Sequence, residues 1–313
     1  MSIDLAARTL KAAAEPTRVR LLLLLGRGEA TVGELQEILE QSQPRVSRHL
    51  HVLAEAGLVE RFRDGQSIYY RLAGDDLPQA ITAVVREAAG VNDLLVLADA
   101  AALDHMHRAR QRAAFSGPAL VAAAQTGGRP PLEELQAVLD ELLAGLDFSE
   151  ALDVGCGGGA LLPWLSAHSA RVTGADIARP MRLLARSRLQ AVGLSNCTIR
   201  DADLHALPFL DDAFDLVLLD EVISRTQTPD TAWREVQRVL RPGGRVLILD
   251  RIEPAARQLA TNRRGLAENE LTAALAAAGL RVVERRWLPG RALDYAAIVA
   301  SPVSFIERTG TDG

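Results

Sequence analysis

Hydrophobic positions recur at helical spacing in the N-terminal part of the chain. In the C-terminal part, segments with helical spacing alternate with short, continuous apolar runs. Up to residue 73 the pattern predicts short amphipathic helices and one hairpin, followed by an alanine-rich and mostly helical stretch. Paired glycines and paired prolines within 127–131 end that stretch. Helices then alternate with short apolar runs, which is typical of an α/β domain with a mostly parallel sheet. We therefore predict an N-terminal module (1–73), a helical dimerisation or linker segment (74–131) and a C-terminal α/β domain (132–313).

Two helices are predicted early in the N-terminal module. Pro16 lies in the first turn of a helix that leads into the apolar run Leu21–Leu25. Thr31 and Glu34 have the spacing of a capping box, in which each side chain bonds to the backbone of the other residue. This box predicts that a second, short helix begins directly after Thr31.

A third helix has two faces of different chemistry. Val46, Leu50 and Leu53 recur at helical spacing and are expected to face the core. Short polar and basic side chains remain on the other face, where they can reach base edges and phosphates in a major groove. These candidate DNA-binding residues are Gln43, Arg45, Ser47, Arg48 and His49.

A hairpin follows, because two strand-like runs flank the turn-forming pair Asp64-Gly65. Arg61, Arg63 and Arg71 lie on these strands and suit phosphate or minor-groove contacts. Between residues 44 and 71 there are five arginines and three acids, so the local charge is positive although the net charge of the chain is −5. These elements predict a winged helix-turn-helix, mostly α with a β-hairpin wing. The alternative is a similar shape that contacts another protein.

The N-terminal module resembles the ArsR/SmtB family of winged-helix repressors over residues 5–73. The resemblance depends on residues 15–20, 43–50 and 53–59. It implies a homodimer that binds a palindromic operator, usually as a repressor, and an effector that releases the DNA. Many members sense metals through a cysteine pair on the helix before the recognition helix. Residues 32–39 contain no cysteine, which excludes thiol-based sensing at that position.

Histidines near the end of the helical segment do not predict a metal site. His105 and His107 are two residues apart, and side chains with that spacing on one helix point away from each other. We therefore predict no metal in this chain.

The C-terminal domain begins with a buried strand, a glycine-rich loop and a second strand that ends in an acid. Gly155 and Gly157 would let the chain turn tightly and let a ligand approach the backbone. Asp176 follows about 20 residues beyond the glycines, the offset at which a carboxylate can accept ribose hydroxyls. With Ala160 the loop also fits the dinucleotide pattern G-x-G-x-x-A, so these features leave a nicotinamide enzyme possible.

The remaining motifs favour another cofactor. In order and spacing, residues 152–159, 207–209, 214–215 and 240–244 resemble class I S-adenosylmethionine-dependent methyltransferases, over residues 132–300. The resemblance implies a Rossmann-like, seven-stranded methyltransferase domain with an antiparallel last strand at 295–300. The bound cofactor would be S-adenosylmethionine or S-adenosylhomocysteine.

The resemblance also implies roles for individual residues. Asp153, Gly155, Gly157 and Gly159 would line the methionine part, and Asp176 with Ile177 would bind the ribose side. Asp203 would accept from the adenine amino group, with Leu204 beside the ring, and Asp220 would complete the cofactor site. Asp220 and Glu221 are the candidates for a catalytic base.

Two departures from the family weaken the enzyme interpretation. Related enzymes often carry a leucine-histidine-histidine after the fourth strand, where this chain has Val222-Ile223-Ser224-Arg225. The segment between Asp250 and Glu270 is short for a substrate lid. The chain lacks the sequence motif of DNA-base methyltransferases, which argues against DNA bases as the methyl acceptor. Arsenite as acceptor would require more thiols than those of Cys156 and Cys197.

Length and composition indicate the number of domains and the cellular compartment. The 313 residues suffice for two domains, and two cysteines argue against a disulfide framework, so we expect a reducing cytoplasm. The N-terminal residues do not read as a secretory signal, and no apolar run is long enough to span a membrane.

The order of the two parts resembles known fusions of an ArsR-type head with a methyltransferase-like tail, some of which regulate the methionine cycle. The first hypothesis is a transcriptional regulator whose tail senses an adenosyl ligand. The second is an active small-molecule methyltransferase that also controls its own gene. The third, a plain dimerisation tail, is disfavoured because the cofactor residues are intact. The operator, the methyl acceptor and the preferred ligand do not follow from the sequence.

Overall fold

The structure is a computed structural model of the whole chain. It describes residues 3–64, 67–73, 76–90, 93–115, 129–194, 196–226, 228–253, 266–288 and 295–303. The chain divides into two compact units, residues 1–116 with 186–198, and residues 117–185 with 199–313. Within the described residues, no helix combines the length and apolarity needed to cross a membrane.

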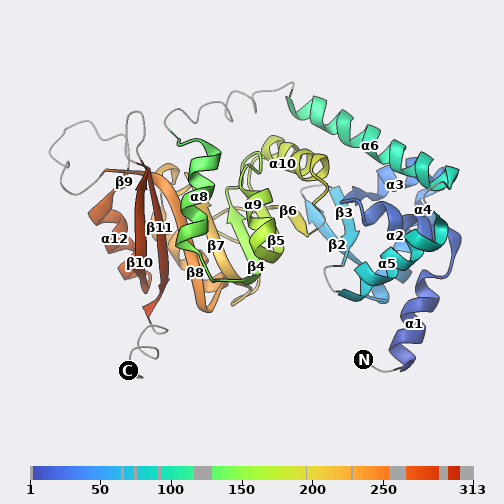
Figure 1. Cartoon of the computed structure of the whole chain (residues 1–313), viewed down its shortest axis with the longest axis horizontal. Helices are drawn as coiled ribbons and strands as arrows, with labels where there is room; N and C mark the ends of the chain where they lie inside the picture. Colours follow the sequence, from blue (N-terminus) through green and yellow to red (C-terminus); the bar gives the residue numbers. More distant parts are fainter. Residues whose placement is uncertain are drawn as a thin grey trace. The chain divides into compact units, whose positions relative to one another are not determined.

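The first unit consists of helices with a small antiparallel sheet (Figure 1). Its sheet has the order β1-β3-β2. The helices are α1 (Ile3–Ala13), α2 (Pro16–Leu25), α3 (Val32–Leu39), α4 (Gln43–Glu55), α5 (Asp76–Ala89) and α6 (Leu94–Phe115), and the strands are β1 (Ala30–Thr31), β2 (Val59–Asp64) and β3 (Ser67–Leu72).

The local predictions for this unit are confirmed. Thr31 and Glu34 form both hydrogen bonds of the capping box at the start of α3. Val46, Leu50 and Leu53 on α4 are fully buried in the core. Strands β2 and β3 pair from Val59 opposite Leu72 onwards, although the predicted turn at Gly65 lies outside the described residues. The winged helix-turn-helix therefore follows from local sequence chemistry.

An ion pair fixes α6 to the helices of the winged helix. Arg20 on α2 donates to Asp99 on α6 through two nitrogens, each 2.6 Å from a carboxylate oxygen. The Asp99 side chain is buried, and Leu103 one turn later is fully buried in the same core. The first part of α6 is therefore built into the winged-helix core, because a buried ion pair holds only when both charges stay in place.

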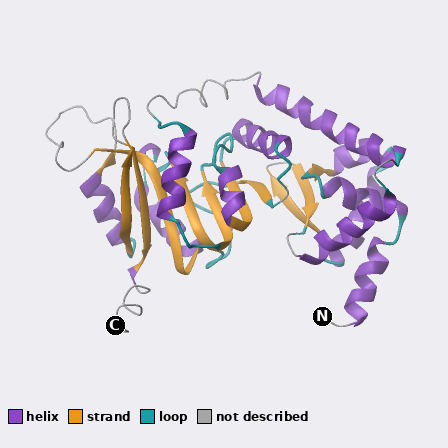
Figure 2. Cartoon of the chain, in the orientation of Figure 1, coloured by secondary structure: helices purple, strands orange, loops and turns teal. Residues whose placement is uncertain are grey.

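The second unit contains a sheet with the strand order β10-β11-β8-β7-β4-β5-β6, to which β9 adds an eighth strand beside β8. Helices pack on the sheet, as Figure 2 shows in purple on orange. The elements are α8 (Leu132–Leu142), β4 (Phe148–Val154), α9 (Leu162–His168), β5 (Ser169–Asp176), α10 (Arg179–Ala191), β6 (Cys197–Asp201), β7 (Phe214–Asp220), η1 (Ile223–Arg225), α11 (Pro229–Val239), β8 (Leu240–Glu253), β9 (Leu266–Ala267), α12 (Glu268–Ala277), β10 (Leu280–Leu288) and β11 (Tyr295–Pro302). Elements α10 and β6 cross the division between the units.

The strand directions confirm the expected Rossmann-like arrangement. Strand β4 is parallel to β5 and to β7, whereas β11 is antiparallel to both of its neighbours. The expected antiparallel last strand therefore lies at Tyr295–Pro302. The carboxyl ends of β4, β5 and β7 meet at one edge, where open α/β sheets bind ligands.

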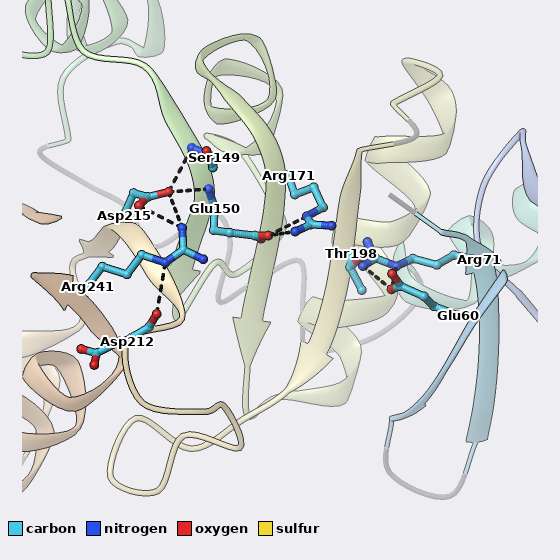
Figure 3. A network of polar contacts seen from close by, with 9 residues as sticks. All are labelled: Glu60, Arg71, Ser149, Glu150, Arg171, Thr198, Asp212, Asp215 and Arg241. Atoms are coloured by element: carbon cyan, nitrogen blue, oxygen red, sulfur yellow. Dashed lines mark hydrogen bonds and ion pairs between the residues drawn. The ribbon is translucent and has the colours of Figure 1, made fainter. Parts of the chain in front are cut away.

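Two of the sequence motifs have a structural role at the opposite edge of the sheet. Asp215 accepts from the backbone N–H groups of Ser149 and Glu150, at 3.0 and 2.9 Å, and pairs with Arg241 at 2.9 Å (Figure 3). A Cβ at Gly244 would lie 2.9 Å from the Asp215 carbonyl oxygen. Residues 214–215 and 240–244 therefore clamp the starts of neighbouring strands.

Candidate functional site

The glycine loop after β4 leaves room beside its backbone. Gly155, Gly157 and Gly159 all have positive φ, at +70°, +51° and +72°, a region that L side chains rarely adopt. A Cβ at Gly155 would lie 2.5 Å from Val222, whereas one at Gly157 would meet nothing within 4 Å. The loop is thus closely packed at Gly155 and open at Gly157, as a ligand that lies against the backbone requires.

Asp176, at the end of β5, supports this loop. Its carboxylate accepts from the backbone N–H of Gly157 at 2.9 Å and from that of Ala178 at 2.7 Å. Arg182 on α10 donates to the carbonyl oxygens of Asp176 and Ile177, each at 2.9 Å. The Ile177 side chain is exposed. Asp176 is therefore held rigidly beside the open part of the loop.

A buried carboxylate, Asp153, lies just before the loop. Its side chain is 2% exposed, and within the described part of the chain Oδ1 has no hydrogen-bond partner. Burial raises the pKa of Asp153 well above its usual range, and the charges of Asp220 and Asp176 raise it further, while Arg129 lowers it. Three predicted site residues thus share one electrostatic environment at the carboxyl edge of the sheet.

Asp220, the last residue of β7, has partners that the sequence did not indicate. Tyr295 donates its hydroxyl proton to Oδ1 at 2.7 Å, and Nη2 of Arg129 lies 2.7 Å from Oδ2. Burial raises the pKa of the Asp220 carboxyl, and the Arg129 charge and the Tyr295 hydrogen bond oppose that rise. Both oxygens of this candidate base are therefore engaged.

Glu221, the other candidate base, is also engaged. It has a positive φ of 51°, its side chain is buried, and Oε2 accepts from Arg225 at 2.6 Å and from Arg251 at 3.0 Å. Two guanidinium groups therefore hold one oxygen of Glu221, while Oε1 is buried and has no hydrogen-bond partner among the described residues. Both candidate bases are thus part of networks of charged and polar side chains at this edge of the sheet.

Asp203 and Leu204 lie apart from this acidic group. Asp203 is exposed and accepts from the backbone N–H of His205 at 2.9 Å, with Nδ1 of His205 at 2.8 Å; these hydrogen bonds lower the pKa of Asp203. Leu204 is buried in the core. Asp201, which ends β6, pairs with Arg182 at 3.0 Å.

The candidate DNA-binding side chains differ in exposure. Gln43, Arg45 and Arg48 on α4 are exposed and Ser47 is half-buried. His49 turns towards α2, where Nδ1 lies 3.4 Å from Glu15.

On the wing, Arg61 and Arg63 are exposed and alternate with the buried Phe62, so both lie on one face of the hairpin. Arg71 instead donates to Glu60 through two nitrogens, at 2.9 and 2.6 Å (Figure 3). The exposed polar surface therefore centres on three residues of α4 and two of β2.

Sequence reasoning missed Arg129 and Tyr295. Arg129 stands between paired glycines and paired prolines, and those residues indicated only a boundary. Tyr295 opens an apolar strand, so its hydroxyl gave no pattern that periodicity could detect. Only the fold brings both side chains to Asp220.

The N-terminal and C-terminal parts of the chain define a winged-helix protein with a methyltransferase-type tail. Comparison with known proteins supports both assignments. Residues 15–61 match the family described as bacterial regulatory protein, arsR family, and residues 152–248 match the family described as methyltransferase domain. The arsenic resistance transcriptional regulator ArsR1 of Pseudomonas putida is 42% identical over 97 residues, which are 31% of this chain and 75% of that protein. The chain therefore belongs to the arsR family of bacterial regulatory proteins and carries a methyltransferase domain after the winged helix.

The tail has relatives of its own. Methyltransferase GfsG of Streptomyces halstedii is 38% identical over 126 residues, which are 39% of this chain and 45% of that protein. The chain thus spans less than half of that relative. The crystal structure of the [4+2]-cyclase SpnF matches with a TM-score of 0.51 and 21% identity, over 63% of this chain and 96% of that chain, a likeness that shows the fold.

Proposed function

We propose that the chain is a DNA-binding transcriptional repressor whose tail senses S-adenosylmethionine or S-adenosylhomocysteine. The observation that carries the proposal is the buried Asp153 carboxyl, whose Oδ1 has no hydrogen-bond partner among the described residues, beside a glycine loop that is open at Gly157. A buried, unpaired carboxylate is costly and calls for a cationic or hydrogen-bonding partner. Both adenosyl ligands carry an ammonium group, and S-adenosylmethionine also carries a sulfonium.

The head supplies the DNA-binding part of this function. Exposed Arg45 and Arg48 on α4 and Arg61 and Arg63 on β2 provide positive charge at a helix and a wing, as recognition of a groove and its phosphates requires. Membership of the arsR family supports a palindromic operator.

We further propose a homodimer. An apolar groove of about 300 Å³ lies among α1, α2 and α5 and is lined by Leu10, Ala13, Val19, Ile81 and Val84, among others. Leu10 and Val84 are exposed, and an apolar surface of this kind is stabilised when a second copy covers it. Cys156 and Cys197 are buried and form no disulfide, which is consistent with the cytoplasm as the compartment.

Sensing is favoured over turnover because the two candidate bases are already paired. Asp220 is held by Tyr295 and Arg129, and Glu221 by Arg225 and Arg251. A sensor needs only differential binding between two states of the head, and it needs no base.

An active methyltransferase is the second candidate, and one observation supports it. The Asp203 carboxylate is hydrogen-bonded to Nδ1 of His205, and Thr226 Oγ1 lies 2.7 Å from Nε2 of the same ring. A carboxylate on one ring nitrogen orients an imidazole, and the other nitrogen can then take a proton from an acceptor. Release of S-adenosylhomocysteine from S-adenosylmethionine with a panel of phenols and amines tests this candidate.

The sensor proposal is tested by operator binding. Purified protein is titrated onto the DNA upstream of its own gene, with and without each adenosyl ligand, and Asp176→Ala serves as the ligand-site variant. A several-fold change in DNA affinity that Asp176→Ala abolishes supports the proposal. Ligand binding without any change in DNA affinity would reject sensing.

A further inference from the structure

A cation of the chain itself lies within the acidic group of the tail. Nη2 of Arg129 is 2.7 Å from Asp220 Oδ2, and the Arg129 side chain is only 16% exposed. Arg129 lowers the pKa of both Asp153 and Asp220, so its charge acts on both carboxylates. The guanidinium thus balances charge at the edge of the sheet where the glycine loop is open.

The pair with Asp220 leaves hydrogen-bonding capacity unused. Among the described residues, Arg129 Nη2 has no acceptor in hydrogen-bonding geometry, although the charges are in contact, and Asp153 Oδ1 has no partner either. A planar guanidinium presents its donors in a fixed fork, whereas an ammonium is compact and has three rotatable donors. A primary ammonium at this position would therefore satisfy the carboxylates better than Arg129 does.

We propose that Arg129 is a built-in counter-ion that occupies the ammonium subsite of the adenosyl pocket and competes with the ligand for Asp220. The inference rests on the proposed function, because it assigns this site to an adenosyl ligand. It adds that the ligand must carry an α-amino group, which takes the place of the guanidinium beside Asp220 and Asp153. An adenosine thioether without an amino group leaves the guanidinium in place.

Charge balance supports competition over simultaneous binding. Burial raises the pKa of Asp153 and of Asp220 and so disfavours the anionic form of each. Arg129 contacts Asp220 and also lowers the pKa of Asp153 through its charge, and a second cation beside it would add repulsion at close range. A ligand ammonium and the Arg129 guanidinium therefore exclude each other.

The position of Arg129 in the chain gives the exchange a consequence. Arg129 precedes α8, the first helix of the tail, and residues 116–128 connect it to the end of α6. Release of Arg129 from Asp220 removes a tether between the start of the tail and its central strand β7. Ligand binding would thereby free Arg129, at the start of the tail, from the central strand.

The experiment measures the Kd of S-adenosylhomocysteine and of 5′-methylthioadenosine by isothermal titration calorimetry, in full-length wild type and in three variants. Arg129→Gln removes the competing charge and keeps polarity, and Arg129→Lys restores a charge. Arg171→Gln removes an arginine paired with Glu150 on the same sheet, away from the loop. Thermal melting by circular dichroism confirms that each variant is folded.

The expected result is that Arg129→Gln binds S-adenosylhomocysteine at least three-fold more tightly and 5′-methylthioadenosine equally well. Arg129→Lys, which keeps a competing charge, should bind S-adenosylhomocysteine no more tightly than wild type, and Arg171→Gln should remain close to wild type for both ligands. Weaker S-adenosylhomocysteine binding in Arg129→Gln would overturn the proposal, because Arg129 would then bind the ligand's carboxylate, and unchanged binding would also overturn it.

The counter-ion role and the proposed function can fail separately. If wild type binds S-adenosylhomocysteine but Arg129→Gln does not differ from it, only the counter-ion role fails. If neither protein binds either ligand, the proposed function fails as well. Binding by Arg129→Gln alone would support the counter-ion role in its strongest form.

Discussion

The guanidinium of Arg129 lies 2.7 Å from a carboxylate oxygen of Asp220, so the residue just before the first helix of the tail is paired with the last residue of its central strand. This pair joins the start of the tail to the edge of the sheet that carries the glycine loop.

If release of Arg129 is what the head senses, a variant without the charge should imitate the ligand. We expect Arg129→Gln, without ligand, to bind the operator with the affinity that wild type has when saturated with S-adenosylhomocysteine, and to respond no further to ligand. Fluorescence anisotropy of labelled operator DNA measures both quantities. A ligand response of wild-type size in Arg129→Gln would contradict the prediction, and Arg171→Gln is the matched control.

Arginines on the head should affect DNA binding in two distinct ways. Arg48→Ala on the recognition helix should weaken operator binding by about 1–3 kcal/mol and relax base specificity. Arg61→Ala on the wing should weaken binding to all sequences and reduce the salt dependence by about one phosphate contact. Arg108→Ala, an exposed arginine of α6, is the control. Equal effects of Arg48→Ala and Arg108→Ala would contradict the assignment of α4.

The Arg20–Asp99 pair should be important for the stability of the head. Asp99→Asn leaves a mostly buried guanidinium without its anion and should cost about 3 kcal/mol. Asp104→Asn, which breaks the exposed pair with Arg27, should cost less than about 1 kcal/mol. Urea unfolding followed by circular dichroism measures the difference.

The three tryptophans of the chain provide an internal control for that measurement. Trp164, Trp233 and Trp287 all lie in the second unit, so their fluorescence reports the tail alone. The tail transition should not move in Asp99→Asn. A shift of equal size in both transitions would show that Asp99 stabilises more than the head.

Local patterns predicted most of this fold and only part of the site. The capping box at Thr31 and Glu34 and the buried stripe on α4 are encoded in short-range spacing, so the sequence alone was sufficient for them. The antiparallel last strand of the tail was expected only from the resemblance to methyltransferases. Arg129 and Tyr295 reach Asp220 across 91 and 75 positions of the chain, and no periodicity encodes such an encounter. The expected roles of Asp203 and Leu204 remain predictions.

Matching the methyltransferase motifs also did not distinguish residues with a structural role from residues of the candidate site. Asp215 and Arg241 belong to the same motif set as Asp153, but they clamp strand starts at the edge opposite the glycine loop. The burial of Asp153 Oδ1 without a hydrogen-bond partner among the described residues depends on tertiary packing and cannot be detected in a single sequence.

The buried carboxyl of Asp153 should make the stability of the tail depend on pH. Its pKa in the folded protein is raised above the value in the unfolded chain, so folding favours the protonated form. The stability that this group contributes is therefore complete below the unfolded pKa and is lost as the pH rises through the folded pKa. Asp153→Asn cannot ionise, and its free energy of unfolding should fall less than that of wild type between pH 4 and pH 8. Some decrease should remain, because Asp220 and Asp250 also have a raised pKa.

Ligand binding should show the opposite pH dependence. A ligand ammonium stabilises the ionised carboxylate, so binding lowers the pKa of Asp153 and releases a proton at any pH below its raised value. Wild type should therefore bind S-adenosylhomocysteine more tightly as the pH rises from 5 to 8, and the heat of binding should vary with the ionisation enthalpy of the buffer. Asp153→Asn should bind more weakly, with a flatter pH profile and less proton release. Equal pH profiles in the two proteins would mean that the ligand's charge does not act on Asp153, and the ammonium subsite would then have to be placed elsewhere.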